Sequence, residues 1–158
     1  MTTERHLGTD ILFDEEGDLA VSRTGDLVLA VGRDCLLQDI RDRLGTLPGD
    51  LYAHPDWGCG IGRLLGAPDT PLNRALAVRY IRHALESEPR VEDNTITITP
   101  LIFAPEEKRF AIRFTPVGGA IPESFVWGFG LSDLSSLTPE AGSRRPEPGY
   151  RRPASGIR

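Results

Sequence analysis

Apolar residues along the chain recur first at strand-like, then at helix-like, and finally again at strand-like spacing. The first helical pattern runs from Arg33 to Gly45, with charged residues at the positions between the apolar ones. Pro48-Gly49 follows within a few residues, so the helix is expected to end at Gly45. Its apolar positions are Leu36, Leu37, Ile40 and Leu44.

A second helix is predicted to begin at Pro71, with Asp69 or Thr70 as its N-cap, and to continue to about Ser87. Pro89 disfavours helical backbone at the residue before it and ends the pattern. Leu72 and Leu76 lie on a neighbouring face, so we expect both faces of this helix to be covered. The main apolar stripe consists of Ala77, Val78, Ile81, Ala84 and Leu85.

Alternation at strand spacing follows over 95–99, where threonine alternates with isoleucine, and over 109–114, where large apolar residues alternate with Arg109, Ala111 and Arg113. It predicts two antiparallel strands joined by a turn around Pro105-Glu106-Glu107. Pro100 has no backbone donor, which places it at a sheet edge or a bulge. A last strand is predicted over 124–129.

Near the N-terminus, Gly17-Asp18-Leu19 and Gly25-Asp26-Leu27 each combine a turn signal with strand-forming residues. The predicted fold class is therefore α+β, with a small antiparallel sheet packed against two main helices. We divide the chain into an N-terminal β-hairpin-like ribbon (1–32), an α+β core (33–129) and an extended tail rich in Pro and Arg, expected to be flexible (130–158).

Charge is distributed unevenly between the core and this tail. The whole chain carries −5, whereas 130–158 contains five arginines against Asp133, Glu140 and Glu147. The acidic remainder argues against nucleic acid as a partner. Two interpretations of the tail stay open: an extension without a binding role, or an arm that orders against an acidic neighbouring surface.

The chain has 158 residues, and none of its apolar runs approaches the ~20 residues that a membrane span needs. The N-terminal sequence also lacks the basic-then-apolar order of a secretion signal. We therefore expect no membrane insertion and a cytoplasmic location.

Candidate chemistry is sparse. His6, His54 and His83 are scattered, and neither they nor the two cysteines have metal-ligand spacing, so no metal site and no cofactor are predicted. Gly58-x-Gly60-x-Gly62 lacks the surroundings of a phosphate-binding loop. Cys35 and Cys59 are expected to be structural thiols, although Cys59 with His54 forms an alternative nucleophilic pair.

No catalytic residue is predicted, but a pair of carboxylates is a second catalytic alternative. Asp56 and Glu88 could form the pair of carboxylates that glycoside hydrolysis requires, which would make the protein a small hydrolase. A generic cytosolic adaptor is the other alternative.

Glu88-Pro89-Arg90 is the most unusual local feature, because opposite charges flank a rigid proline between a helix and a strand. One interpretation is a helix stop with an internal ion pair, which contributes little if it is exposed. The other is a rigid display of Glu88 and Arg90 toward a partner, where arginine can bind carboxylates or carbonyls.

The order of several short motifs resembles the baseplate wedge and sheath-initiator family of contractile phage tails and contractile injection systems, which includes the related type VI secretion baseplate subunit. The resemblance covers residues 8–129 and leaves the tail outside. The motifs are Gly8-Thr9-Asp10, Gly25-Asp26-Leu27, Gln38-Asp39-Ile40-Arg41-Asp42-Arg43-Leu44-Gly45-Thr46, Pro48-Gly49, His54-Pro55-Asp56-Trp57-Gly58 and Glu88-Pro89-Arg90.

The resemblance implies a structural, non-enzymatic protein that joins the baseplate wedge to the first sheath ring, in six copies. It implies that Glu88, Pro89 and Arg90 bind the wedge, and that strands of the sheath protein add to the sheet. Phe125, Val126, Trp127 and Phe129 are the candidates for this shared strand region. Tube and spike-hub proteins are further candidate partners.

Overall fold

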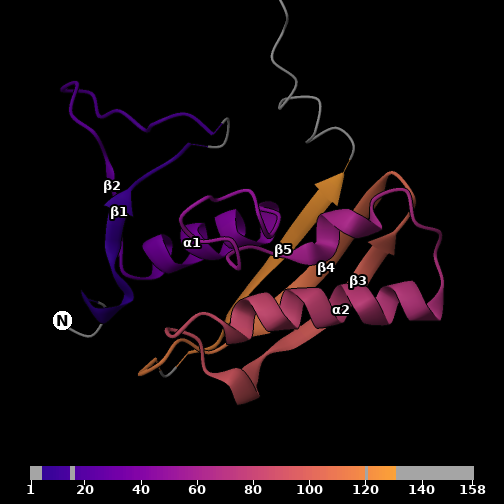
Figure 1. The fold of residues 1–158 in the computed structure, drawn as a ribbon. Coiled ribbons are helices and arrows are strands. Elements are labelled where there is room, and N and C mark those ends of the chain that lie inside the picture. Colours follow the sequence, from indigo (N-terminus) through magenta and orange to yellow (C-terminus); the bar gives the residue numbers. More distant parts are fainter. Residues whose placement is uncertain (1–4, 15–16, 120, 131–158) are drawn as a thin grey trace, which may run out of the picture.

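The computed structural model describes residues 5–14, 17–119 and 121–130. Two helices, α1 and α2, cover one face of an antiparallel sheet, and an N-terminal arm extends away from this body (Figure 1). This is the predicted α+β class. The main elements are α1 (Arg33–Gly45), α2 (Pro71–Glu86), β1 (Thr9–Ile11), β2 (Leu29–Val31), β3 (Thr97–Phe103), β4 (Glu107–Phe114) and β5 (Glu123–Gly130), with short 3-10 turns η1 (Arg5–Leu7), η2 (Gly60–Leu64) and η3 (Asp93–Thr95).

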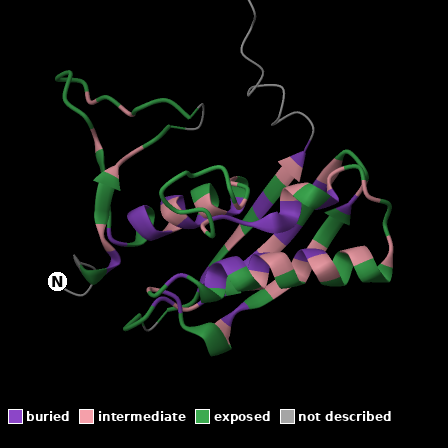
Figure 2. Cartoon of the chain, viewed as in Figure 1, coloured by how far each residue is buried: buried purple, intermediate pink, exposed green. Residues whose placement is uncertain are grey.

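One apolar core lies between the helices and the sheet (Figure 2). The sheet contributes Phe110, Ile112 and Phe114, all essentially without solvent exposure. These are alternate residues of β4, the central strand, so the alternation in the sequence correctly predicted which face is buried. The helices contribute Leu36, Ile40, Leu44, Ala77, Ile81, Ala84 and Leu85.

Both helices have the boundaries that the sequence predicted. Thr70 caps α2 by accepting a hydrogen bond from the backbone nitrogen of Asn73 (3.1 Å), and Pro71 is the first helical residue. The expectation that both faces of α2 are covered was wrong at Leu72, which is 69% exposed. This residue lies in the first turn of the helix.

The strands β3, β4 and β5 form an antiparallel sheet in that spatial order. The register between β4 and β5 is regular from Glu107 opposite Gly130 to Phe114 opposite Glu123. The register between β3 and β4 shifts between Pro100 and Ile102. Pro100 therefore lies on an edge strand beside an irregularity, as its missing donor predicted.

The N-terminal arm (residues 9–31) has the two predicted turns, with Gly17 and Gly25 at positive φ. Its pairing differs from the predicted ribbon. Thr9–Ile11 forms β1 and pairs with β2, whereas 18–21 makes only isolated bridges, between Phe13 and Leu19 and between Val21 and Leu27.

Lys108, the one lysine of the sequence, is fully buried although the other residues on the inner face of β4 are apolar. Its ammonium group donates to the backbone carbonyls of Ala67 and Ala104 and lies 4.5 Å from the ring centroid of Phe103. Burial lowers the pKa of this lysine. The side chain ties the loop before α2 to the β3–β4 turn, a role that alternation alone does not reveal.

The loop between α1 and η2 folds back on the helix end, where the backbone nitrogen of Cys59 donates to the carbonyl of Thr46 (2.8 Å). Trp57 is half-buried, whereas Tyr52 is fully exposed. Of the two aromatic residues of this loop, only Trp57 is therefore partly covered.

Gly58 makes this close approach possible. Its φ is +123°, and a Cβ there would lie 2.5 Å from the carbonyl oxygen of Thr46. We predict that Gly58→Ala lowers the free energy of unfolding by about 1–3 kcal/mol more than Gly49→Ala, because both changes strain a positive-φ backbone but only the Cβ at position 58 overlaps a neighbouring atom. Gly49 also has positive φ (+102°), but no atom would meet its Cβ within 4 Å.

Urea unfolding of both variants and of the wild type measures this difference. Equal losses in the two variants would contradict the proposed steric role of Gly58.

Candidate functional site

The end of α2 is fixed by a series of tight turns. The backbone nitrogen of Glu88 donates to the carbonyl of Leu85 (3.0 Å), and that of Val91 donates to the carbonyl of Glu88 (3.0 Å). These bonds place Pro89 on the exposed side of the turn and direct the Glu88 side chain inward. Glu88-Pro89-Arg90 is hereafter called the junction.

Glu88 is only 5% exposed and lies between two arginines. One carboxylate oxygen accepts from Nε of Arg90 (2.6 Å), and the other accepts from a guanidinium nitrogen of Arg43 in α1 (3.4 Å). A buried carboxylate needs such partners, because an unpaired buried charge is costly.

Arg90 extends this network to the N-terminal segment. It donates to the backbone carbonyl of Leu7 (2.8 Å) and pairs with Asp39 of α1 (2.8 Å). Gly8 has a φ of +101°, and a Cβ there would lie 3.2 Å from the Arg90 guanidinium and 3.3 Å from the Cys35 sulfur. One arginine thus joins three segments that are far apart in sequence.

Arg43 is held between the junction and the preceding loop. Its guanidinium carbon lies 5.1 Å from the ring centroid of Trp57. Trp57 belongs to the His54-Pro55-Asp56-Trp57-Gly58 motif. Its Nε is buried without a hydrogen-bond partner among the described residues. Two of the motifs singled out in the sequence therefore meet through this arginine.

The electrostatics of Glu88 follow from these contacts. Burial by itself raises the pKa of a carboxyl group, but the hydrogen bonds and charges of Arg90 and Arg43 outweigh burial, so the pKa of Glu88 is lowered. The two arginines thereby hold this carboxyl group ionised. In the isolated chain Glu88 and Arg90 form an internal ion pair, in which the carboxylate is buried and the guanidinium is partly exposed.

The same geometry disfavours both catalytic alternatives. Glu88 has a lowered pKa, which does not suit the general acid of a glycosidase, and both of its buried carboxylate oxygens are occupied by arginines, which does not suit the nucleophile or base. Burial raises the pKa of Cys59 to about 11, and His54 lies on the exposed side of its loop. A protonated, buried thiol is a poor nucleophile.

The predicted strand-contact residues lie on β5, which is at an edge of the sheet formed by the described strands. Phe125, Trp127 and Phe129 are wholly or partly buried on the core face, where the indole of Trp127 stacks on Phe129 at 6.0 Å. Val126 faces the opposite side and is 60% exposed. Only Val126 of the four therefore presents its side chain on the open face.

Among the described helices, none is long and apolar enough to cross a membrane. The same residues hold no group of three or more His, Cys, Asp or Glu side chains suited to a metal ion. The fold and its charge network thus define a small α+β domain whose distinctive features are a rigid junction and a sheet edge.

The chain belongs to the baseplate wedge protein gp25 family, whose model matches residues 30–116. It is thus a structural baseplate component of a phage-tail-like particle that interacts with other baseplate proteins. The match includes the junction, Arg43 and Trp57. No curated protein matches the sequence significantly.

Two solved structures are similar to the chain. One is a candidate tail lysozyme from Geobacter sulfurreducens, with 26% identity and a TM-score of 0.52 over 60% of this chain and 86% of that chain. The other is in the anti-feeding prophage baseplate determined with 6-fold symmetry, with 16% identity and a TM-score of 0.50 over 85% of this chain and 96% of that chain. At 16% identity, the similarity to the second structure shows a shared fold and no more.

The lowered pKa of Glu88 generates a prediction on acid stability. A carboxyl group whose pKa is lower in the folded than in the unfolded chain stabilises the fold above its unfolded-state pKa of about 4.3. This contribution is lost as the pH falls through the folded-state pKa. We expect Glu88→Gln to be about 3 kcal/mol less stable than the wild type near neutral pH, with a smaller difference in acid.

Urea unfolding of both proteins from neutral pH into acid tests this expectation, with the exposed neighbour Glu86→Gln as the matched control. Parallel pH profiles of the wild type and Glu88→Gln would contradict the assigned role of Glu88.

Proposed function

We propose that the protein links the baseplate wedge to the first ring of the sheath, and that it templates the sheath by accepting a strand at β5. The observation that carries this proposal is the contrast between the two edges of the three-stranded sheet. Each edge strand has backbone groups that no described strand pairs with, and such groups can pair with an incoming chain.

The two edges differ in regularity. β3 contains Pro100, which lacks a backbone donor, and its register shifts just after that residue. β5 has eight residues in unbroken register and no proline. A regular edge of this length can continue an antiparallel or parallel ladder, whereas the β3 edge is interrupted near its middle. We therefore assign strand addition to β5.

The side chains of β5 lie on two faces of the sheet and have different roles on each. Phe125, Trp127 and Phe129 pack toward the core and hold the strand in place, so the incoming strand binds mainly through backbone hydrogen bonds. Ser124, Val126 and Gly128 line the open face, where the incoming chain's side chains would lie beside them. This face also contains a shallow groove of about 510 Å³ along Thr97, Ala111 and Val126.

The junction is proposed to bind the wedge. Because Glu88 is buried and paired, we assign to it and to Arg43 the positioning of the turn rather than direct contact. The exposed ring of Pro89 and the partly exposed guanidinium of Arg90 are the groups that a wedge protein could touch. The rigid backbone reduces the entropy lost on binding.

We further propose six copies around the tail axis, assembly in the cytoplasm, and tube or spike-hub proteins as additional neighbours. The 6-fold symmetry of the anti-feeding prophage baseplate supports the copy number by analogy of fold alone.

Val126→Lys tests the assigned edge. Val126 is largely exposed, so a lysine there should leave the free energy of unfolding within about 0.5 kcal/mol of the wild type. A long charged side chain beside the edge should oppose strand addition, so baseplates should form without attached sheath. Electron microscopy of assembled particles measures this outcome.

The matched control is Leu101→Lys, which places the same charge at the 53% exposed Leu101 of β3. Sheath attachment should survive this change. Loss of the sheath with Leu101→Lys but not with Val126→Lys would refute the assignment to β5.

Pro89→Ala tests the wedge contact without breaking the buried ion pair. The change should cost about 0.4–1 kcal/mol of stability, because it removes a rigid residue. We expect binding to purified wedge proteins to weaken at least about tenfold, a free-energy change of about 1.4 kcal/mol. Pro105→Ala, at an exposed proline in the β3–β4 turn, is the control. Unchanged affinity of Pro89→Ala would rule out contact at Pro89.

A further inference from the structure

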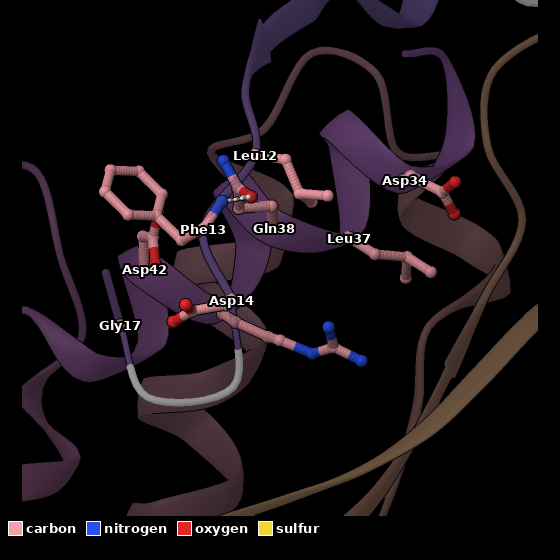
Figure 3. A pocket seen from close by; sticks show the side chains of 9 residues that line it. Leu12, Phe13, Asp14, Gly17, Asp34, Leu37, Gln38 and Asp42 are labelled. Atoms are coloured by element: carbon pink, nitrogen blue, oxygen red, sulfur yellow. Dashed lines mark hydrogen bonds between the residues drawn. The ribbon is translucent and has the colours of Figure 1, made fainter. Parts of the chain in front are cut away.

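A groove of about 690 Å³ lies between the N-terminal arm and the outer side of α1 (Figure 3). The family assignment and the proposed wedge and sheath contacts do not use it. Leu12 and Phe13 contribute to it from the arm, and Asp34, Leu37 and Asp42 contribute from the helix. Its surface is thus part apolar and part acidic.

Gln38 builds this groove. Its side-chain oxygen accepts from the backbone nitrogen of Phe13 (3.0 Å), and its side-chain nitrogen donates to the carbonyl of Ile11 (2.8 Å). Figure 3 shows this amide facing the arm backbone. One buried side chain therefore holds the arm at a fixed distance from α1, so the groove is part of the folded structure.

The groove has an excess of negative charge. Asp14, Asp34 and Asp42 line it, and Arg41 is the one basic residue in its lining. The guanidinium carbon of Arg41 also lies 5.7 Å from the ring centroid of Phe125, toward the sheet. Burial raises the pKa of Asp42, the carboxylates of Asp39 and Asp10 raise it further, and the guanidinium of Arg41 opposes this shift.

We propose that this groove binds the arginine-rich segment 144–158 of the same chain. That segment contains five arginines, at 144, 145, 151, 152 and 158, and Glu147 is its one acidic residue. The guanidinium groups suit the carboxylates of Asp34 and Asp42, and their flat faces can stack on the exposed ring of Phe13. Three prolines favour an extended chain that fits a groove.

The length of the chain is sufficient for this contact. Phe125 of β5 lies against Arg41, which lines the groove, and Gly130 is five residues beyond Phe125, about 17 Å along the strand. The 13 residues between Gly130 and Arg144 can span about 40 Å when extended at about 3.1 Å per residue. Attachment to the same chain also gives the segment a high effective concentration at the groove.

A spin label in the full-length chain tests the proposal. Ser155→Cys provides the attachment site, and the two native cysteines are buried and therefore protected from labelling. In NMR spectra of the dilute protein, amide signals of residues 12–14 and 34–42 should lose most of their intensity. Signals of residues 97–103 in β3 should stay unchanged.

Two further variants assign the contact to charge. Asp34→Asn with Asp42→Asn, and replacement of all five tail arginines by glutamine, should each restore the groove signals. Glu92→Gln with Glu106→Gln removes the same charge from exposed sites outside the groove and should leave the broadening intact. Each groove variant should retain the dispersed amide spectrum of the folded wild type.

Three results would overturn the proposal. These are uniform weak broadening, selective broadening elsewhere on the surface, and groove broadening that persists in both charge variants. The last test is a mixture of two kinds of chain. One kind carries the spin label but no NMR-active isotope, and the other carries the isotope but no spin label. Groove broadening in this mixture, where the spin label and the observed groove are on different chains, would show that the segment comes from a second copy, contrary to the proposal.

Discussion

The ion network around Glu88 is the constraint on which the rest of the structure depends. A carboxylate that is 5% exposed must be paired, and its partners come from α1 and from the turn that follows α2. Arg90 in turn requires the carbonyl of Leu7, which fixes the start of the N-terminal arm. Moving any one of these segments would remove a partner from a buried or partly buried charged group of this network.

This constraint connects the two surfaces proposed to act in assembly. The network holds α1 against the end of α2, and α1 contacts β5 through the Arg33–Glu123 ion pair and the Arg41–Phe125 contact. A wedge protein bound at the junction and a strand added at β5 would therefore share one rigid body. Force could pass between them through the packed core, because packed interiors deform little.

The elements themselves were largely predictable from local sequence. Pro71 and the cap at Thr70 specify the start of α2, and alternation in β4 specifies which residues are buried, because both signals depend on neighbouring residues alone. Pairing within the arm was less predictable. β1 has three residues, too few for periodicity to distinguish it from a loop, and it pairs with β2 across about twenty residues.

The sequence by itself therefore determined the α+β class, the helix boundaries, the order of the sheet hairpin and the identity of the junction as a rigid turn. Only the tertiary structure decided between display and burial of Glu88, since Arg43 lies 45 positions away and Leu7 lies 83 positions from Arg90. It likewise placed Lys108 in the core and Tyr52 in solvent. Burial and ion pairing depend on which segments meet in space, and the spacing of residues along the chain does not predict those distant contacts.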